Sequence, residues 1–252
     1  MGPPPLSRPL WLNEFERPSF PPTRSALREP NGLLAVGGSL SPSWLLEAYA
    51  RGIFPWFDEN QPILWWSPAP RAVIYPAAVH TARSLRKAVR RDPFEAVVDS
   101  DFVGVIQGCA AARKNSTGTW ITHDMVEAYI HLFELGYAHS VEVRLDGQLV
   151  GGIYGVALGG VFFGESMFSA VPNGSKIALV ALCRLWVQMG GRLLDCQMPN
   201  DHLMRMGCTE IERETFESLL AEHITKQSIP RFNAAWTHCR GQTLPLYDYF
   251  EA

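Results

Sequence analysis

The sequence predicts an α+β fold in which one mixed β-sheet is covered by helices. Three strand-like segments follow one another between residues 138 and 168, and the dipeptides Asp146-Gly147 and Gly159-Gly160 between them favour hairpin turns. Helical segments precede this meander, and a helix, a strand, a helix and a strand follow it. Strands in series followed by helices are typical of α+β proteins. Hydrophobic residues make up 47% of the 252 residues and charged residues 19%, so the chain can bury a core.

The first 70 residues predict a small, irregular domain. The segment is rich in proline and aromatic residues, and its one clear helix runs from Ser41 to Arg51. Ser41 suits the N-cap, Pro42 suits the first helical position and Gly52 suits the stop. The remainder predicts turns and short strands. Its aromatic residues more often form a core than a ligand site; they include Trp56, Phe57, Trp65 and Trp66.

A basic helix is predicted at residues 80–92. Five cations fall on one face of it, namely Arg83, Arg86, Lys87, Arg90 and Arg91. Ala82, Leu85 and Val89 fall on the other face. The whole chain carries a net charge of −3, so this stripe is a local concentration of positive charge. It is either a solvated helix face or a surface that contacts the phosphate backbone of a nucleic acid.

Helices and strands alternate in the rest of the chain. We expect helices at 102–112 and 123–135, strands at 138–145, 148–158 and 161–168, a helix at 175–189, a strand at 192–197, a short helix from about residue 200, a strand at 208–211 and a last helix at 213–222. Tyr129 lies on the apolar stripe of its helix and is expected in the core. Residues after 227 are expected to be loosely structured. The order is similar to that of Gcn5-related acyltransferase-like mixed-sheet domains, a likeness of fold alone, and it sets the domains at 1–70 and 71–252.

Several chemistries find no motif in this sequence. The five cysteines form no CxxC pair, which favours neither disulfides nor a metal site. There is no GxxxxGK[ST], no GxGxxG after a strand and no GxSxG nucleophile elbow. The loop SAVPNGSK has one glycine and no basic residue before it, which disfavours coenzyme A. No leader peptide or membrane-spanning run is evident, so we expect a cytoplasmic protein.

Two polar features remain near the ends of predicted strands. Glu165 interrupts the aromatic run VFFGESMFS, where a buried carboxylate needs a partner or a changed pKa. Asp195 and Gln197 are two residues apart in a strand and should share a face, with Cys196 on the other. If the two strands are neighbours, Glu165, Asp195 and Gln197 converge, and they suit a guest that is cationic at one end and apolar at the other. Alternatively, Asp195 caps a turn and Glu165 pairs with a local arginine.

Seven stretches, in order, resemble a known family. They are PNGLLAVGGSLSPSWLLEAYARGIFPWF, PILWWSPAPR, GTWIT, VGGIYGV, FGESMFS, NGSKIAL and DCQMPNDHL, and they span roughly residues 20–220. In these stretches the chain resembles the leucyl/phenylalanyl-tRNA–protein transferases. The resemblance implies an aminoacyltransferase of bacterial cytoplasm that needs no coenzyme. Such enzymes move leucine or phenylalanine, and less readily methionine, from charged tRNA to the N-terminal α-amine of proteins that begin with arginine or lysine, which marks those proteins for degradation.

The resemblance also implies roles for particular residues. It places a catalytic pair at Asp195 and Gln197, in which Asp195 orients the amide and Gln197 hydrogen-bonds the attacking amine. It places Glu165 in the site, where we expect it to face the cationic acceptor. Trp56 and Trp120 match tryptophans that contact the 3′-terminal adenosine, and Tyr49 lies in a matching block. Candidates for the donor side-chain pocket, each of which could instead be ordinary core, are Ile153, Phe162, Met167, Leu179, Leu182 and Leu194. The acceptor stem of the tRNA would lie on the basic helix, against Arg83, Arg86, Lys87, Arg90 and Arg91.

The chain departs from the family pattern at Ser39, Gly174 and Ile153, and the last of these could alter the balance between leucine and phenylalanine. The implied partners are Leu-tRNA, Phe-tRNA and acceptor proteins with N-terminal arginine or lysine, with no membrane, no metal, no cofactor and a monomeric protein. Two other functions stay open, a coenzyme A-dependent N-acetyltransferase and a noncatalytic tRNA-binding protein. Bound acetyl-coenzyme A would favour the first, and the intact polar residues of the two strand ends argue against the second.

Overall fold

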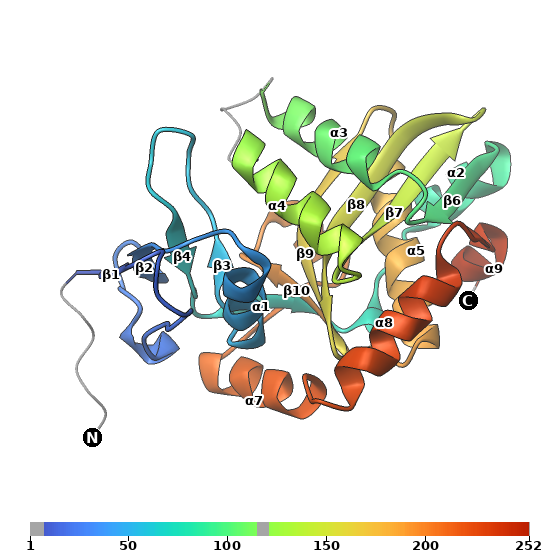
Figure 1. Ribbon diagram of the computed structural model, residues 1–252. Coiled ribbons are helices and arrows are strands. Elements are labelled where there is room, and N and C mark those ends of the chain that lie inside the picture. Colours follow the sequence, from blue (N-terminus) through green and yellow to red (C-terminus); the bar gives the residue numbers. More distant parts are fainter. Residues whose placement is uncertain (1–7, 115–120, 252) are drawn as a thin grey trace.

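The N-terminal part of the chain forms a small four-stranded sheet with one helix beside it (Figure 1). The computed structural model describes residues 8–114 and 121–251. In the sheet order β1-β2-β4-β3, the strands are Leu10–Leu12, Leu33–Gly37, Leu64–Trp66 and Phe54–Pro55, and a 3₁₀ turn spans Thr23–Ser25. Helix α1 (Pro42–Ala50) follows its N-cap Ser41, as the sequence predicts, and ends before Gly52, whose φ of +70° suits glycine.

Most of the remaining chain builds one curled, mixed sheet of eight strands. Its order is β11-β5-β10-β9-β8-β7-β6-β12. In that order the strands are Thr209–Ile211, Arg71–Ile74, Leu193–Gln197, Val161–Ser169, Gln148–Leu158, Ala138–Leu145, Phe94–Val98 and Thr243–Leu244. Within the described residues, β9 and β10 are the one parallel pair of this sheet, and the other neighbours are antiparallel. An α+β fold with a mixed sheet is therefore confirmed.

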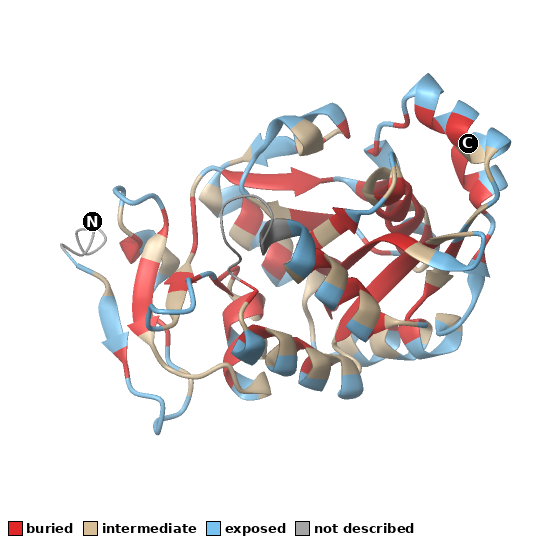
Figure 2. Ribbon diagram, turned by 90° about the horizontal axis from the view of Figure 1, so that it is seen from above, coloured by how far each residue is buried: buried red, intermediate tan, exposed pale blue. Residues whose placement is uncertain are grey.

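Helices cover both faces of the large sheet (Figure 1). Helices α3 (Phe102–Lys114) and α4 (His123–Glu134) pack on one face, and α5 (Gly174–Gln188) packs on the other. The remaining helices are α2 (Arg83–Arg91), α6 (Asp201–Arg205), α7 (Arg213–His223), α8 (Ser228–Cys239) and α9 (Leu246–Glu251), with a 3₁₀ turn at Pro76–Ala78. A hydrophobic core lies on each face, so buried residues gather on the central strands and on the helix faces turned toward them (Figure 2).

Two expectations about local structure are wrong. Ala82 is exposed, because it is the N-cap of α2 and not part of its apolar face, which Leu85 and Ala88 form. The residues after 227 are not loosely structured, because they form α8, β12 and α9. Pro230 obscures the helix signal there, although a proline in the first turn of a helix removes no hydrogen bond. Strand β12 pairs with β6, and Trp236 of α8 is fully buried.

Replacing Trp236 by alanine is expected to lower the free energy of unfolding by about 3–5 kcal/mol, because the indole leaves a large cavity. The ring stacks on His139, with centroids 4.2 Å apart, and packs against Trp186. Urea denaturation measures the change. Tyr247→Ala is the control, since that side chain on α9 is 62% exposed and should change stability by less than about 0.5 kcal/mol. Equal stability of the two variants would mean that α8 is not part of the cooperative core.

Each strand of the parallel pair carries a bulge where the pairing ends. Strands β9 and β10 pair as far as Phe163 and Asp195. On β9 the register with β8 then shifts, so that Glu165 has no partner between Gly164 and Ser166. On β10 the register with β5 shifts at the residue between Asp195 and Gln197. A bulge redirects side chains and increases local twist, so the two strands separate beyond this point and leave room between them.

Glycine is required opposite the bulge of β9. A Cβ atom added to Gly155 would lie 2.1 Å from the main-chain oxygen of Phe163. No side chain fits at that distance, so the close approach of β8 to the bulged strand depends on this residue.

Candidate active site

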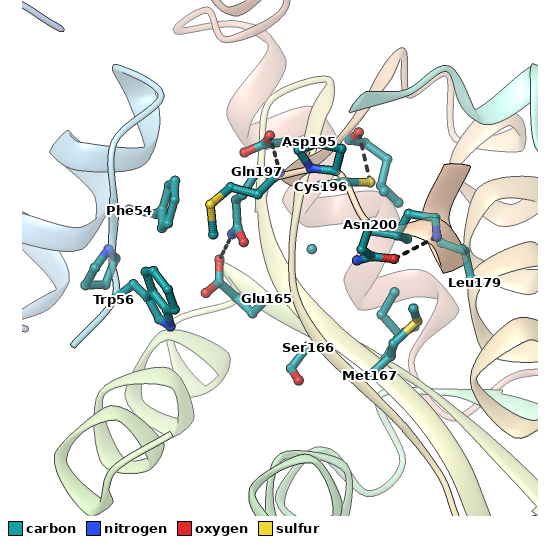
Figure 3. A pocket seen from close by; sticks show the side chains of 17 residues that line it. Phe54, Trp56, Glu165, Ser166, Met167, Leu179, Asp195, Cys196, Gln197 and Asn200 are labelled. Atoms are coloured by element: carbon teal, nitrogen blue, oxygen red, sulfur yellow. Dashed lines mark hydrogen bonds between the residues drawn. The ribbon is translucent and has the colours of Figure 1, made fainter. Parts of the chain in front are cut away.

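A cavity of about 320 Å³ occupies the space where β9 and β10 separate (Figure 3). Its walls come from the N-terminal sheet, β8, β9, α5, β10 and the segment that leads into α6. The lining residues are Phe54, Pro55, Trp56, Ile153, Gly164, Glu165, Ser166, Met167, Leu179, Leu194, Asp195, Cys196, Gln197, Met198, Pro199, Asn200 and Leu203. Apolar side chains dominate this set, and the polar groups gather at the two bulges. Such a cavity suits a ligand that is apolar with a polar end.

Glu165 lies at the polar end of the cavity and is held by three donors. Its Oε1 accepts hydrogen bonds from the Tyr49 hydroxyl at 2.7 Å and from Nε2 of Gln197 at 3.1 Å. Its Oε2 accepts a bond from the Tyr129 hydroxyl at 2.8 Å, and the two tyrosine hydroxyls also contact each other. Figure 3 shows Glu165 and Gln197 turned toward each other, with Phe54 and Trp56 on one side of them. Helices α1 and α4 and strand β10 thus converge on one carboxylate.

Burial sets the protonation of this group. It raises the pKa of Glu165 to about 7, against the opposing effect of the hydrogen bonds from Tyr49 and Tyr129. Burial, and then the neighbouring Glu165 carboxylate, raise the pKa of both tyrosines well above their ordinary value. The phenols therefore stay protonated and remain hydrogen-bond donors, while Glu165 changes its charge near neutral pH.

The free energy of unfolding is expected to fall by about 3 kcal/mol, through Glu165 alone, as the pH rises from 4.5 to 7. The native pKa lies above the ordinary value of 4.5 for a glutamate, so the native state binds more protons than the unfolded state in this window and loses that advantage as the proton leaves. Urea denaturation of the wild type and of Glu165→Gln at several pH values measures it. A stability difference between the two that is constant from pH 4.5 to 8 would contradict the raised pKa.

Asp195 is fully buried and is paired with a buried arginine. Nε of Arg71 donates to Oδ1 of Asp195 at 2.8 Å, and Nη2 donates to Oδ2 at 2.7 Å. The guanidinium of Arg71 lies between the rings of Phe54 and Phe216, 4.9 Å and 4.7 Å from their centroids. The Arg71–Asp195 pair is thus packed between Phe54 of the N-terminal sheet and Phe216 of α7. The alternative in which Glu165 pairs with an arginine is wrong, since the arginine pairs with Asp195. The other part of that alternative is present, because Oδ1 of Asp195 also caps the turn at Gln197 by accepting its main-chain N–H.

Gln197 links the two carboxylates. Its main-chain N–H donates to Oδ1 of Asp195 at 3.0 Å, and its side-chain amide donates to Glu165. Its φ of +63° is left-handed, a conformation that a non-glycine residue adopts only when its surroundings hold it. Cys196 also borders the cavity. Its thiol lies beside Cys208 in the core on the α5 face, whereas Asp195 meets Arg71 beside Phe54 and Phe216 of the other core, so Cys196 faces away from Asp195 as expected.

The similarity to known proteins covers both parts of the chain. A model of the leucyl/phenylalanyl-tRNA protein transferase family matches residues 73–221, and a model of the N-terminal domain of the same family matches residues 38–69. The chain belongs to this family. A leucyl/phenylalanyl-tRNA–protein transferase of Hydrogenovibrio crunogenus is 51% identical over 234 residues, which cover 92% of this chain and 90% of that protein. The protein of that name from an Azoarcus species is 56% identical over 206 residues, with 82% and 87% covered.

Solved structures give only a distant likeness. The crystal structure of a functionally unknown conserved protein from Staphylococcus epidermidis covers 71% of this chain and 68% of its own, with 10% identity and a TM-score of 0.40. That score is too low to bear on the fold. In residues 8–114 and 121–251, no group of three or more histidine, cysteine, aspartate or glutamate side chains is placed to hold a metal ion. No helix of the same residues is long and apolar enough to cross a membrane.

The residues proposed for donor binding from the family resemblance divide into two groups. Those that line the cavity are Trp56, Ile153, Met167, Leu179 and Leu194. Phe162 and Leu182 do not line it; Phe162 packs against Trp186 and Trp236 in the core, and Leu182 lies in the same core. Tyr49 is fully buried behind Glu165 and supports that carboxylate instead of bordering the cavity. Trp120 lies outside the described residues.

Trp56 is the aromatic residue most open to a ligand at the cavity. It is 37% exposed, and its ring meets that of Trp66 edge-on at 5.6 Å. The indole Nε1 of Trp66 donates to the main-chain oxygen of Trp56 at 2.7 Å, which fixes the segment directly after β3. An exposed, held indole is a stacking surface for a planar ring.

The basic helix presents fewer free cations than its sequence suggests. Arg90 pairs with Glu251 of α9, and Arg91 pairs with Asp92. None of the ion pairs formed within the described ranges involves Arg83, Arg86 or Lys87, and these three side chains are exposed. With Thr81 and Arg90 they line a surface hollow. Helix α2 therefore offers three to four cations to an anionic partner.

Sequence reasoning missed Arg71 and the role of Tyr129. Each carried a weak signal. Arg71 opens the apolar strand Ala72–Ile74, and a buried arginine needs an acidic partner. Tyr129 occupies a core position of its helix, where a phenol needs a hydrogen-bond acceptor. Neither signal says which residue the partner is, because both partners lie on strands far away in the sequence.

Proposed function

We propose that this protein transfers leucine or phenylalanine, and less readily methionine, from charged tRNA to the N-terminal α-amine of proteins that begin with arginine or lysine. The transfer would mark the acceptor for degradation. The observation that carries the proposal is the cavity between β9 and β10, which joins an apolar wall to the Glu165–Gln197–Asp195 cluster. The family membership supports the same reaction. An aminoacyl ester is already activated, so the reaction requires positioning and proton transfer and no nucleotide hydrolysis.

The donor side chain would lie against the apolar wall formed by Ile153, Met167, Leu179 and Leu194. These residues come from β8, β9, α5 and β10, so the wall is held by the centre of the sheet. A hydrophobic wall of this kind binds leucine, phenylalanine and methionine side chains, and it rejects charged ones because their desolvation is not compensated.

The polar end of the cavity would hold the reacting atoms. Gln197 hydrogen-bonds the attacking amine, and Asp195, fixed by Arg71, holds the main chain of Gln197 in its left-handed conformation. Glu165 faces the acceptor and attracts its positive charge. The three groups thus orient the amine toward the ester carbonyl, which is the main requirement of an aminolysis reaction.

The RNA would contact two separate surfaces. The 3′-terminal adenosine stacks on Trp56, with Trp120 as a second candidate from the family resemblance, and the acceptor stem lies on α2. Contacts to phosphates carry no sequence information, so this helix would bind the stem of any tRNA.

The three exposed cations of α2 can be removed together in the triple variant Arg83→Ala, Arg86→Ala and Lys87→Ala. This variant should bind tRNA more weakly, and its binding should depend less on the salt concentration. Each phosphate contact releases about 0.7–0.9 counterions, so the slope of log K against log salt should decrease by about 2–3. Fluorescence titration of tRNA at several salt concentrations measures the slope. A matched triple variant, Arg17→Ala, Arg28→Ala and Lys226→Ala, removes the same charge from exposed positions elsewhere and should keep the wild-type slope. Equal slopes in the two triple variants would exclude α2 as the RNA surface.

The proposal also covers the division into domains, the oligomeric state and the location of the protein in the cell. Residues 1–70 and 71–252 act as two domains, and the second has the Gcn5-related architecture. The change of sheet between Trp66 and Arg71 and the parallel β9–β10 pair after a meander support this. The protein works as a monomer in the cytoplasm, where charged tRNA is made.

The test of the function is a panel of donors and acceptors. Purified protein is incubated with Leu-, Phe-, Met- and Asp-tRNA and with peptides that begin with arginine, lysine, alanine or N-acetylated arginine, and the products are read by mass spectrometry. We expect products from the first three donors and from the arginine and lysine peptides alone. Transfer to N-acetylated arginine, or equal transfer to alanine, would contradict the proposed acceptor.

A further inference from the structure

The carboxylate of Glu165 has room for one more hydrogen bond. An ionised carboxylate accepts about four hydrogen bonds, two on each oxygen. The Tyr49 hydroxyl and the Gln197 amide occupy Oε1, and the Tyr129 hydroxyl occupies one position on Oε2. The residue is only 5% exposed, yet it lines the cavity, so a group bound there reaches the remaining position. An acceptor amine that contacts Gln197 lies near the Glu165 carboxylate, since the amide of Gln197 donates to Oε1 of Glu165.

The two tyrosines satisfy Glu165 in both of its protonation states. When Glu165 is ionised, each hydroxyl donates to it. When Glu165 is protonated, its O–H can donate to the Tyr129 oxygen, Tyr129 can donate to Tyr49, and Tyr49 still donates to Oε1, because the two hydroxyls are in contact. The three groups form a closed ring, so a proton arrives or leaves by hydroxyl rotation without leaving a buried polar atom unpaired.

We propose that Glu165, held by Tyr49 and Tyr129, is the base that takes the proton of the acceptor α-amine during transfer; this inference rests on the function proposed above. The amine nitrogen forms a bond to the ester carbonyl carbon, and the bond from that carbon to the ribose oxygen breaks. The amine proton passes to the Glu165 carboxylate and is then delivered to the departing ribose oxygen. An ester and an amine become an amide and a hydroxyl, so the carboxylate is regenerated in each turnover.

The charges around Glu165 allow it to act in this way near neutral pH. Tyr49 faces it from α1, Tyr129 from α4, and Gln197 and Asp195 from β10, while Arg71 of β5 compensates the charge of Asp195. Desolvation raises the pKa of Glu165 to about 7, close to the range in which an N-terminal amine titrates. Proton transfer between groups of similar pKa has no large uphill step.

The experiment is a pH profile of single-turnover transfer from saturating Leu-tRNA to a peptide with N-terminal arginine. In the wild type the rate should rise with pH through an apparent pKa near 7, below the separate titration of the peptide amine. Glu165→Gln should lower the maximal rate by about 100-fold. It should also remove the rise of the rate near pH 7 and leave the rise that follows the titration of the peptide amine. Tyr129→Phe removes a bond that lowers the pKa of Glu165, so the limb near pH 7 should move to higher pH by about one unit.

Tyr249→Phe is the matched control for the tyrosine variant. Its hydroxyl is likewise in a buried residue and donates to Gln188 at 2.7 Å, but it lies on α9, away from the cavity. It should leave the profile unchanged. The proposal is overturned if the limb near pH 7 persists in Glu165→Gln, or if Tyr129→Phe shifts it no more than Tyr249→Phe. A wild type that transfers no leucine at any pH overturns the function as well, whereas normal transfer with an unshifted limb overturns only the role of Glu165.

Discussion

Asp195→Asn is expected to lower the transfer rate about 100-fold and the free energy of unfolding by about 3–5 kcal/mol. The isosteric amide keeps the volume of the side chain but removes the charge that faces Arg71, which stays buried at 1% exposure. An unpaired guanidinium in the core is the main source of the lost stability. The rate falls because the new amide NH2 faces Nη2 of Arg71, which is also a donor, so the side chain moves away. Oδ1, which accepts the main-chain N–H of Gln197, moves with it, and a shift of Gln197 by about 1 Å takes its side-chain amide away from the attacking amine.

Asp99→Asn is the matched control for this variant. Asp99 is also buried, pairs with His139 at 2.7 Å and accepts the main-chain N–H of Ser140 at 2.7 Å. It lies outside the cavity, so its replacement should reduce stability and leave the rate per folded molecule unchanged. Urea denaturation and single-turnover transfer measure the two quantities. If Asp195→Asn and Asp99→Asn have the same rate, Asp195 serves stability alone.

Arg71→Lys is expected to reduce kcat by roughly 10–100-fold while the KM for Leu-tRNA changes by less than about threefold. Lysine keeps the charge but loses the two parallel bonds to Asp195, and it loses the planar contact with Phe54 and Phe216. Arg71 is a positioning residue, because it touches Asp195 and does not line the cavity. Steady-state transfer at varied Leu-tRNA gives the two constants.

Arg213→Lys separates positioning from support of the fold. Arg213 is nearby and binds the hydroxyl and the main-chain oxygen of Ser67 at 2.9 Å each, but it does not touch Asp195. It should lower the Tm and leave kcat unchanged. In the double variant of Arg71→Lys with Asp195→Asn, the rate should equal that of Asp195→Asn alone, since Arg71 acts through Asp195. Multiplicative losses would show that the two residues act independently.

The sequence predicted the parts of the fold that depend on local signals. Ser41 and Pro42 mark the start of α1, the Asp146-Gly147 turn sets the β7–β8 hairpin, and the helices from α3 to α7 follow their periodicity. The short strands β5 and β6 were missed, although β10, which is no longer than β6, was predicted. The C-terminal helices were missed because their burial depends on contacts with distant strands, as in the stacking of Trp236 on His139.

The polar residues at the centre of the site were predicted from the sequence. The residues that hold them in place were not. The sequence singles out Glu165, Asp195 and Gln197 because a polar group near the end of a buried strand is costly unless it has a hydrogen-bond partner or a ligand. The bulges that bring them together leave no mark in the sequence. Arg71, Tyr49 and Tyr129 come from three other elements, and only the packing of the two sheets and α4 places them around the carboxylates.

The most direct measurement is single-turnover transfer of radiolabelled leucine from purified Leu-tRNA to a peptide with N-terminal arginine, with neither ATP nor coenzyme A present. The wild type should form the labelled peptide, and Asp195→Ala should lose nearly all of this activity while Asp99→Asn keeps it. Retained tRNA binding without any labelled product would contradict an aminoacyltransferase and indicate a protein that only binds RNA. Product formation that survives Asp195→Ala would leave the reaction in place and contradict Asp195 and Gln197 as its catalytic pair.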